Sequence, residues 1–333
     1  MEPRTRPPHS VRHYASRDSL YPLVVIVGPS ASGKSDLALA AAEHFGGEII
    51  NFDSVQVYRH FDIGTAKTPP AERRGVPHHL IDIVEPAATF TAGDYAHLAR
   101  KAIADVRARG SLPIMAGGTG LYLRAALQGL FQGPERDETL RQRLEDQVAS
   151  KPPGYLHRLL TRLDAASAGR IHARDTPKLI RALEVCLRGR APMSRQWEQN
   201  AKQPLEGCEV IRIGLNPPRA ALYERIARRS GKMFASGLAE EVKRLLEQGV
   251  SRQARAFGSL GYRQALRYQE GQLSAQQAVE ETAKLTRRYA KRQTTWFRRE
   301  PGVEWFAGFG DDPAIMERVS ARLAERLAPY ASG

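Results

Sequence analysis

The sequence predicts an α/β fold in which helices cover a parallel sheet, and three observations lead to this prediction. Short, continuous apolar runs alternate with segments whose apolar residues recur at helical spacing, as in sheets that are buried on both faces. A glycine-rich segment joins the first apolar run to the first helical segment. From about residue 131 to 204 the strand pattern disappears, and charged helical segments replace it. The α/β core is therefore expected to carry a mostly helical insertion domain.

The strands and helices of the core are expected in a regular order. The first strand, Leu23–Gly28, runs into the glycine-rich segment, and the Ala- and Leu-rich segment Lys34–Glu43 then forms a helix. Thr91 and Asp94 resemble a capping box that opens a helix ending at Gly110. Further strands are expected at 48–53, 112–118 and 209–216, and the last long helix from Ser274 to about Arg299.

Changes of composition along the 333 residues predict the domain boundaries. The strand pattern stops and later resumes, which a helical insertion inside one α/β domain explains better than two domains in series. The expected parts are a flexible basic arm at 1–20, a core at 21–130 and 205–310, a helical insertion at 131–204, and a C-terminal tail or helix at 311–333.

Charge and cysteine content restrict the partners and the compartment. Lys and Arg number 50 against 36 Asp and Glu, a formal charge of +14, which favours a nucleic acid partner, although a soluble protein can be basic without one. Cys186 and Cys208 are too few for a disulfide framework or a zinc finger, so a cytoplasmic protein is expected. No run approaches a membrane span, and residues 1–20 lack the apolar stretch of a secretory signal. We expect no membrane association and a monomeric chain.

Residues 28–35, GPSASGKS, match the phosphate-binding pattern G-x-x-x-x-G-K-[ST]. Glycines allow a tight turn in which backbone N–H groups point at an anion, and the helix that follows adds its positive N-terminus. Lys34 supplies a charge and Ser35 a hydroxyl ligand for Mg²⁺. This strand, loop and helix predict a P-loop NTPase-like fold. The candidate diphosphate-binding residues are Gly28, Pro29, Ser30, Ala31, Ser32, Gly33, Lys34 and Ser35.

Polar residues are expected opposite this loop, because ligand sites of parallel sheets lie outside the carboxyl ends of the strands. Asp53 ends the second strand and is followed by Ser54, Val55 and Gln56, and Thr119 follows the third strand. A carboxylate here either holds a metal ion, usually through water, or acts as a base. The alternatives are a turn role for Asp53 and a helix N-cap role for Thr119. The loop by itself does not decide between ATP and another diphosphate.

Seven segments in a fixed order behind the P-loop carry a specific resemblance: DSVQVY, DIGTAK, VPHHLIDIVEP, GGTGLYLRAAL, RALEV, GYRQ and AKRQTTWFR. From about residue 22 to 306 the chain resembles the bacterial tRNA dimethylallyltransferase (tRNA isopentenyltransferase) family. The resemblance implies transfer of a dimethylallyl group from dimethylallyl diphosphate to the exocyclic N6 of the adenosine 3′-adjacent to the anticodon in tRNA. The products are N6-dimethylallyladenosine and diphosphate. The P-loop then holds the diphosphate of the prenyl donor, and ATP is not a substrate.

The resemblance also implies roles for individual residues. Asp53 is the general base for the adenine amine. General-base catalysis typically raises a reaction rate by about 10²- to 10⁴-fold. Lys34, the loop amides and Mg²⁺ bound by Ser35, where the family usually has Thr, stabilise the departing diphosphate. Arg229 matches the arginine that closes over the diphosphate, although its neighbours Arg225 and Arg228 make this assignment less secure.

The anticodon stem-loop of tRNA is the partner that the resemblance implies, with the target base flipped out of its stack. Asp53, Ser54, Val55, Gln56 and Thr119 surround the base, and Arg141 of the insertion contacts the RNA. Two further segments are expected to touch tRNA. They comprise Pro177, Lys178, Leu179, Ile180 and Arg181, and Gly258, Ser259, Leu260, Gly261, Tyr262 and Arg263. As alternatives, the two cations of the first segment are exposed helix charges and the tyrosine of the second is a core residue.

The last long helix combines basic and aromatic residues at helical spacing. Its cations are Lys284, Arg288, Lys291 or Arg292, and Arg299, interleaved with Tyr289, Trp296 and Phe297. This pattern suits phosphate contacts, and it suits an amphipathic helix with exposed charges equally well. The adjacent His78 and His79 lack a third ligand at metal spacing, which favours structural packing.

Three other functions share some of these features. A P-loop small-molecule or nucleoside kinase would use the same fold, and an isopentenyltransferase acting on free AMP would use the same chemistry. The helical insertion and the charge of +14 argue against a mononucleotide acceptor. A non-catalytic RNA-binding protein with a vestigial loop is the third alternative, although the loop and Asp53 are both intact.

Overall fold

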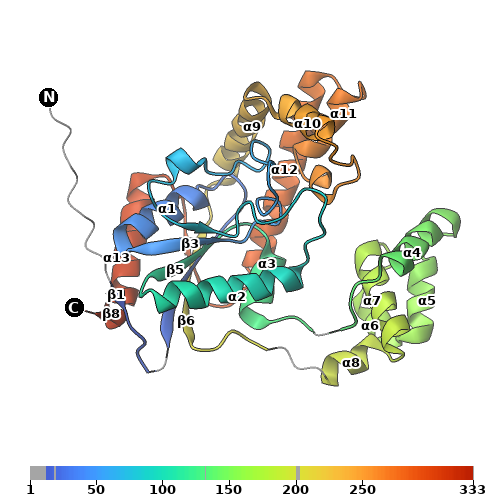
Figure 1. The fold of residues 1–333 in the computed structure, drawn as a ribbon, viewed down its shortest axis with the longest axis horizontal. Helices are drawn as coiled ribbons and strands as arrows, with labels where there is room; N and C mark the ends of the chain where they lie inside the picture. The colour runs from blue at the N-terminus through green and yellow to red at the C-terminus, as the bar shows by residue number, and fades with distance from the viewer. Residues whose placement is uncertain (1–12, 19, 132, 200–202, 333) are drawn as a thin grey trace. The chain divides into compact units, whose positions relative to one another are not determined.

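A computed structural model describes residues 13–18, 20–131, 133–199 and 203–332 of the chain. The described residues form two compact units (Figure 1). One unit consists of the residues up to 127 and from 205 onward, and the other of residues 128–204, the region where the sequence predicts a helical insertion.

The larger unit is built on a six-stranded sheet with the strand order β4-β3-β5-β2-β6-β7. Its strands are β2 Tyr21–Val27, β3 Gly47–Asn51, β4 His78–His79, β5 Leu112–Ala116, β6 Cys208–Leu215 and β7 Val303–Phe306. Every neighbouring pair is parallel, which confirms the predicted α/β class. The sequence pattern does not predict β4 and β7, because strands of two and four residues are too short to show a period.

Helices cover both faces of this sheet (Figure 1). Val24 and Ile26 of β2 share a hydrophobic cluster with α1 and α13, whereas Val25 and Val27 share another with α2 and α3. Successive side chains of a strand point to opposite faces, so a strand covered on both sides is apolar throughout. The covering helices are α1 Lys34–Phe45, α2 Ala92–Ala108, α3 Gly120–Gln128 and α13 Pro313–Leu327.

Four more helices belong to the C-terminal part of the larger unit: α9 Arg219–Ala235, α10 Leu238–Glu247, α11 Tyr262–Gln269 and α12 Ala275–Phe297. A short 3₁₀ helix, Arg255–Gly258, precedes α11. Ser274 and Gln277 form a capping box at the start of α12, where the sequence predicts the last long helix to begin. The predicted capping box of Thr91 and Asp94 is also present, at the start of α2. α12 packs against both α9 and α11.

The insertion unit is helical throughout the part that the structure describes. Its helices are α4 Glu138–Ser150, α5 Tyr155–Leu163, α6 Ala165–Arg170, α7 Thr176–Gly189 and α8 Met193–Gln199. Leu144, Leu156, Leu160 and Leu183 belong to its hydrophobic core. The unit therefore has a core of its own.

A buried ion pair joins two helices of the insertion. Arg141 of α4 donates two hydrogen bonds of 2.8 and 2.9 Å to Glu184 of α7, whose side chain is fully buried. The Asp137 backbone N–H and Arg181 also donate to this carboxylate. Burial by itself would raise the pKa of Glu184, but these hydrogen bonds lower it to about 2. The positive charge of Arg141 thus helps to neutralise a buried carboxylate.

The first described residues differ from the predicted arm, whereas the C-terminal end contains a helix, one of the two forms that the sequence predicts for 311–333. His13–Tyr14 (β1) pairs with Ala331–Ser332 (β8), and the buried Tyr14 donates a hydrogen bond of 2.9 Å to the Phe45 carbonyl oxygen. The predicted flexible arm at 1–20 is therefore wrong for residues 13 and 14, because this aromatic side chain is part of the core; residues 1–12 and 19 lie outside the described residues. α13 is likewise part of the core, with four apolar residues buried. Within the described residues, every helix is too short or too polar to cross a lipid bilayer.

The ion pair of the insertion leads to a stability prediction. Arg141→Ala should lower the free energy of unfolding of this unit by about 1–3 kcal/mol, since it removes two hydrogen bonds from a buried carboxylate that Arg181 still holds. Amide hydrogen exchange in α4 and α7 measures the loss. Arg143→Ala removes an exposed arginine of the same helix and is the matched control. Equal exchange rates in the two variants would contradict the structural role.

Candidate active site

The glycine-rich loop lies between β2 and α1, and close contacts require both of its key glycines. A Cβ atom on Gly28 would lie 2.9 Å from the Ser32 hydroxyl oxygen. Gly33 has a φ of 82°, and a Cβ atom there would lie 2.7 Å from the Gly310 nitrogen. α1 begins directly after this turn, at Lys34. The N-terminus of α1 therefore adjoins the loop, where the motif predicts that an anion binds.

Lys34 is partly buried and folds back over the loop. Its Nζ donates a hydrogen bond of 2.7 Å to the Pro29 carbonyl oxygen. Burial, and then the positive charge of Arg229, lower the pKa of Lys34 to about 7, while the Asp53 carboxylate acts in the opposite direction. These three charged groups thus influence one another. An anion bound beside Lys34 would raise its pKa again.

Two hydroxyl groups of the loop are available to a ligand. Ser32 Oγ is buried and has no hydrogen-bond partner among the described residues. Ser35 lies in the first turn of α1 and is exposed. Buried polar groups normally have a partner, so the orphaned hydroxyl indicates that a ligand completes this loop.

A buried glutamine of α12 fixes the loop from the other side. Gln293 accepts hydrogen bonds from the Ser30 backbone N–H, at 2.7 Å, and from the Ser30 hydroxyl, at 3.0 Å. Its side-chain nitrogen donates at 3.0 Å to the Gly118 carbonyl oxygen after β5. Sequence analysis misses this role, although Gln293 lies in the segment AKRQTTWFR. The structure thereby ties the P-loop to the loop after β5.

Asp53 has the turn role that the sequence leaves as one alternative, and it also lines a cavity. Its Oδ1 accepts hydrogen bonds from the backbone N–H groups of Val55 and Gln56, at 2.9 and 3.3 Å. Its Oδ2 has no hydrogen bond within the part of the chain that the structure describes. Thr119 Oγ1 accepts a hydrogen bond of 3.0 Å from the Ser54 backbone N–H, so this side chain fixes the Asp53 loop.

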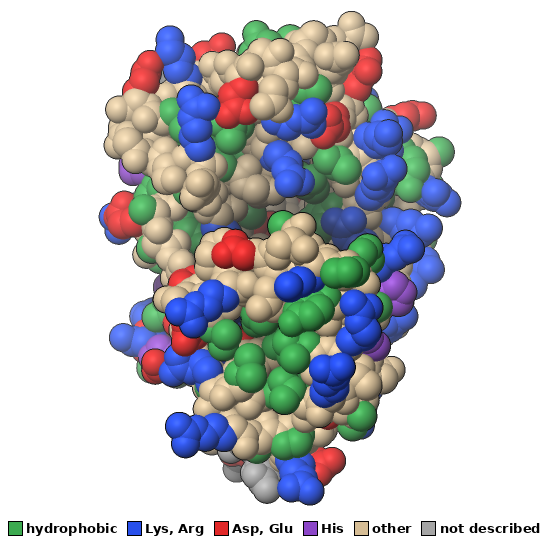
Figure 2. All heavy atoms as spheres, turned by 90° about the vertical axis from the view of Figure 1, so that its right-hand side faces the viewer, with side chains coloured by type: hydrophobic (Ala, Val, Ile, Leu, Met, Phe, Trp, Pro, Cys, Tyr) green, Lys and Arg blue, Asp and Glu red, His purple; other side chains and the backbone are tan. Residues whose placement is uncertain are grey.

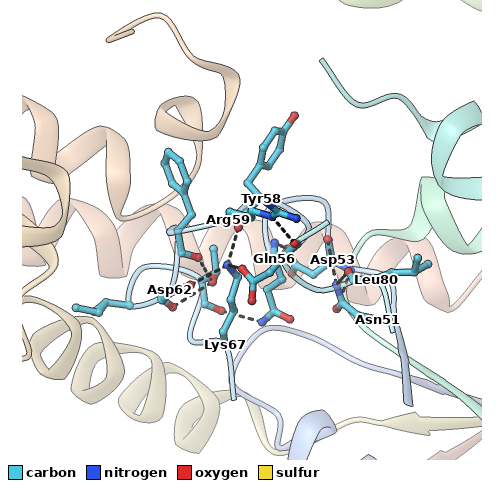
Figure 3. A network of polar contacts seen from close by, with 12 residues as sticks. Asn51, Asp53, Gln56, Tyr58, Arg59, Asp62, Lys67 and Leu80 are labelled. Atoms are coloured by element: carbon cyan, nitrogen blue, oxygen red, sulfur yellow. Dashed lines mark hydrogen bonds and ion pairs between the residues drawn. The ribbon is translucent and has the colours of Figure 1, made fainter. Parts of the chain in front are cut away.

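The chain that follows Asp53 is held by a buried lysine (Figure 3). The Lys67 ammonium group donates to the Tyr58 carbonyl oxygen and to the carboxylates of Asp62 and Asp82, at 2.5, 2.8 and 2.5 Å. Gln56 Nε2 donates at 3.1 Å to the Thr65 carbonyl oxygen across the same loop. These bonds give the loop one fixed conformation next to the carboxylate.

Asp53, Ser30 of the P-loop and Arg229 line one cavity of about 470 Å³. The remaining lining residues come from the Asp53 loop, from the α9 region, from the segment before α11 and from α12. They are Ser54, Val55, Gly64, Thr65, Ile226, Ser230, Met233, Gly258, Ser259, Leu260, Arg263, Thr282, Leu285, Thr286, Tyr289 and Arg292. The glycine-rich loop and the candidate base thus line the same space, and apolar side chains form part of its wall.

The structure distinguishes the three candidate arginines of α9. Arg225 forms a two-pronged ion pair with Asp311, at 2.6 and 2.7 Å, and Arg228 is exposed and absent from the cavity wall. Arg229 lines the cavity and donates a hydrogen bond of 3.4 Å to the Thr65 carbonyl oxygen. Burial lowers the pKa of its guanidinium, a direction that a bound anion would reverse.

The segment 258–263 is only partly a surface. Gly258, Ser259, Leu260 and Arg263 line the cavity. Tyr262 is fully buried, donates a hydrogen bond to Glu241 and accepts one of 3.1 Å from the Gly64 backbone N–H. The predicted tRNA contact of Tyr262 is therefore wrong, since no atom of it reaches the surface. Gly261 has a φ of 87° and starts α11.

The predicted RNA contacts of the insertion belong to the other unit. Pro177 and Lys178 are exposed at the start of α7, whereas Leu179 and Ile180 are buried in the core of the insertion. For these two apolar residues the predicted contact is wrong. The RNA contact of Arg141 stays a prediction: its guanidinium binds the buried Glu184, as described above, and its side chain is 18% exposed. Arg181 is about one-third exposed and binds the same carboxylate.

One wall of the cavity consists of the α12 residues Thr282, Leu285, Thr286 and Tyr289, of which the sequence analysis singles out Tyr289 alone. Burial, and then the nearby Asp53 carboxylate, raise the pKa of Tyr289 to about 12, so its hydroxyl keeps its proton at neutral pH. These residues recur at steps of three and four, which marks one face of a helix. The spacing is visible in the sequence, but the sequence does not show that this face of the helix lines the cavity.

The donor set fits a magnesium ion that is bound mainly through a phosphate ligand. Mg²⁺ in phosphate-transfer sites keeps waters and uses one or two protein oxygens in addition to the phosphates. Ser35 and Asp53 can supply such oxygens, and no group of three or more His, Cys, Asp or Glu residues at metal-binding distance occurs among the described residues. His79 binds Glu48 at 2.7 Å, and His78 lies 2.8 Å from the Val76 carbonyl oxygen.

Basic side chains spread over much of the molecular face in Figure 2, with fewer acidic ones between them. This distribution agrees with the formal charge of +14. A surface of this kind attracts polyanions over distances of about a Debye length, roughly 8–10 Å at physiological salt.

Comparison with known proteins places this geometry in a family. The family model described as IPP transferase matches residues 56–300. A tRNA dimethylallyltransferase of Solibacter usitatus is 53% identical over 306 residues, which cover 92% of this chain and 99% of that protein.

Two solved structures have the same fold over most of the chain. The full-length tRNA isopentenylpyrophosphate transferase of Bacillus halodurans superimposes with a TM-score of 0.67 at 37% identity, covering 92% of this chain and 97% of that one. A eukaryotic dimethylallyltransferase acting on tRNA gives a TM-score of 0.73 at 25% identity, covering 91% of this chain and 77% of that one. With its P-loop, Asp53 and Arg229 around one cavity, the chain belongs to the IPP transferase family, that of the tRNA dimethylallyltransferases.

Proposed function

We propose that this protein transfers a dimethylallyl group from dimethylallyl diphosphate to the exocyclic N6 of the adenosine 3′-adjacent to the anticodon in tRNA. The observation that carries the proposal is the shared cavity of about 470 Å³ between Ser30 of the P-loop, Arg229 and Asp53. Its volume lies within the range of about 300–1,000 Å³ that is usual for small-molecule sites. The family membership of the chain supports the same reaction.

The donor diphosphate binds at the P-loop in this proposal. Lys34, the N-terminus of α1 and Arg229 supply positive charge there. Ile226, Met233 and Leu285 line the same cavity and suit a short branched hydrocarbon chain. As the allylic C–O bond breaks, negative charge grows on the departing diphosphate, and these fixed cations stabilise it.

The acceptor adenine enters the cavity as a flipped base, with N6 towards Asp53. The lone pair of this amine is delocalised into the ring, which makes it a weak nucleophile. As N6 forms its bond to the allylic carbon, Asp53 accepts a proton from the amine. Asp53 Oδ1 is occupied by two backbone N–H groups, so Oδ2 is the oxygen that takes the proton.

We further propose that Mg²⁺ accompanies the diphosphate, with Ser35 as its protein ligand and Asp53 as a ligand through water. When bound, the ion would neutralise part of the charge of the leaving group. We place the reaction in the cytoplasm, where a basic protein of this family would meet its tRNA substrate. A kinase function is disfavoured because the chain matches the IPP transferase family over residues 56–300.

Asp53→Asn tests the assignment of the base. We expect prenyl transfer to fall by about 10²- to 10⁴-fold, because the amide cannot accept the proton, while tRNA affinity changes little. Mass spectrometry of nucleosides from tRNA incubated with enzyme and dimethylallyl diphosphate measures the product. Asp105→Asn, which alters an exposed aspartate on α2, is the control. Wild-type rates in the Asp53 variant would exclude the role.

Lys34 gives the donor site a predicted pH dependence. Its pKa in the free protein is about 7, and a bound diphosphate raises that value, so the protonated lysine is the form that binds. The affinity for inorganic diphosphate should therefore decrease as the pH rises from 7 to 9, by up to about tenfold per pH unit.

Lys34→Arg is the matched control for this experiment, because its guanidinium stays protonated throughout the range. Isothermal calorimetry at several pH values should show a steeper loss of affinity in the wild type than in this variant. The titration of diphosphate itself is common to both proteins. Parallel pH profiles would refute the link to Lys34.

A further inference from the structure

The connection between β7 and α13 packs directly against the glycine-rich loop. The Gly310 backbone N–H donates a hydrogen bond of 2.8 Å to the Ser32 carbonyl oxygen. A Cβ atom on Gly310 would lie 2.3 Å from the Gly33 carbonyl oxygen, so the two backbones come closer than a side chain would allow. We call residues 309–311 the backing segment. It belongs to the same unit as the loop.

The backing segment brings a carboxylate to the start of α1. A Cβ atom on Gly33 would lie 2.8 Å from Asp311 Oδ1, and Gly33 immediately precedes Lys34, the first residue of the helix. The carboxylate therefore lies at the same helix N-terminus that the motif offers to an anion. A negative charge at this place repels a bound diphosphate, because like charges at short distance raise the free energy of the complex.

Arg225 of α9 neutralises this carboxylate. Two of its guanidinium nitrogens donate hydrogen bonds of 2.6 and 2.7 Å to the two oxygens of Asp311. In the part of the chain that the structure describes, no other cationic side chain lies within 4.0 Å of Asp311. These hydrogen bonds hold the pKa of Asp311 below its usual range, so the carboxylate is ionised at neutral pH and Arg225 balances its charge.

A ring contact also holds the Arg225 guanidinium. It lies over the Phe309 ring of the backing segment, 4.8 Å from the ring centre. Phe309 in turn packs against the apolar cluster that contains Ala31 of the loop and Ile226 of α9. Two-pronged hydrogen bonding and the ring contact together give the guanidinium one position. Any effect of Arg225 on a bound anion therefore passes through Asp311.

A second carboxylate increases the negative charge at this place. Asp36 lies in the first turn of α1. Burial, and then the Asp311 carboxylate, raise the pKa of Asp36, whereas Arg225 and Arg74 lower it. The charge of Arg225 thus acts on both carboxylates. Without Arg225, two negative side chains would adjoin the N-terminus of α1.

We propose that Arg225 sets the affinity of the glycine-rich loop for the donor diphosphate by neutralising Asp311. Arg225 is a positioning residue, since it acts through another side chain and does not line the reaction cavity. This inference rests on the proposed function, because it concerns the site to which that function assigns the diphosphate. It gives a role to the arginine that lies one helical turn before Arg229.

Variants of the pair, titrated with inorganic diphosphate, test the proposal. Arg225→Gln leaves Asp311 unpaired and should bind diphosphate about tenfold more weakly than the wild type, because an uncompensated negative charge then adjoins the loop. Arg225→Gln/Asp311→Asn removes both charges and should bind within about twofold of the wild type. Asp311→Asn alone should bind at least as tightly as the wild type. Isothermal calorimetry at constant pH and low salt measures these affinities.

The controls separate charge from packing. Arg225→Lys keeps the positive charge and should retain most of the affinity. Arg228→Gln removes an exposed charge from the same helix and should bind like the wild type. In 1 M salt, where the Debye length is about 3 Å, the loss in Arg225→Gln should shrink to about twofold. A distorted loop would instead keep its weaker affinity at every salt concentration.

Three results would overturn the proposal. An unchanged affinity in Arg225→Gln would remove its basis. An equal loss in Arg225→Gln and Asp311→Asn would make the pair a structural link between α9 and the backing segment. Absence of recovery in the double variant would mean that the guanidinium acts on the diphosphate without Asp311. Failure of the proposed function is a separate outcome, because the wild type would then bind diphosphate and transfer no dimethylallyl group to tRNA.

Discussion

The separation between the phosphate loop and the candidate base is fixed by a series of hydrogen bonds that starts at the buried amide of Gln293. Its oxygen binds Ser30, and its nitrogen binds the carbonyl oxygen of Gly118. The next residue, Thr119, holds Ser54, which directly follows the candidate base. A transfer between two bound molecules depends on such fixed spacing, since reacting atoms must meet at about 3–3.5 Å. Loss of the hydrogen-bond partner of any buried group in this series would lower the free energy of unfolding by about 1–3 kcal/mol.

A second set of buried charges fixes the turn that leads to Gly64 and Thr65, two residues of the cavity wall. The Glu241 carboxylate accepts hydrogen bonds from the backbone N–H groups of Asp62 and Ile63 and from Tyr262, and burial raises its pKa. The Lys67 ammonium group neutralises the Asp62 carboxylate in the same turn. Because Arg229 binds the Thr65 carbonyl oxygen beside this turn, the loop, the arginine and the cavity wall keep one arrangement.

The sequence predicts the parts of the site that a local pattern determines. The glycines of the P-loop and the carboxylate after β3 are set by backbone geometry and strand order, so a motif suffices to find them. The ion pair of Arg141 with Glu184 and the burial of Tyr262 could not be predicted in this way, because a local pattern does not show which side chains of a charged helical segment meet a buried partner. Gln293 was missed for a related reason, since only tertiary packing decides which polar residue of a long helix is turned inwards.

Much of the candidate site depends on α12, although this helix lacks a broad apolar face. One face of α12 holds the glycine-rich loop through Gln293 and lines the cavity through Tyr289, which lies four residues earlier. Side chains four residues apart are neighbours on a helix surface, so a single rigid helix can make both contacts. Any shift of α12 therefore moves the glycine-rich loop and this wall of the cavity together.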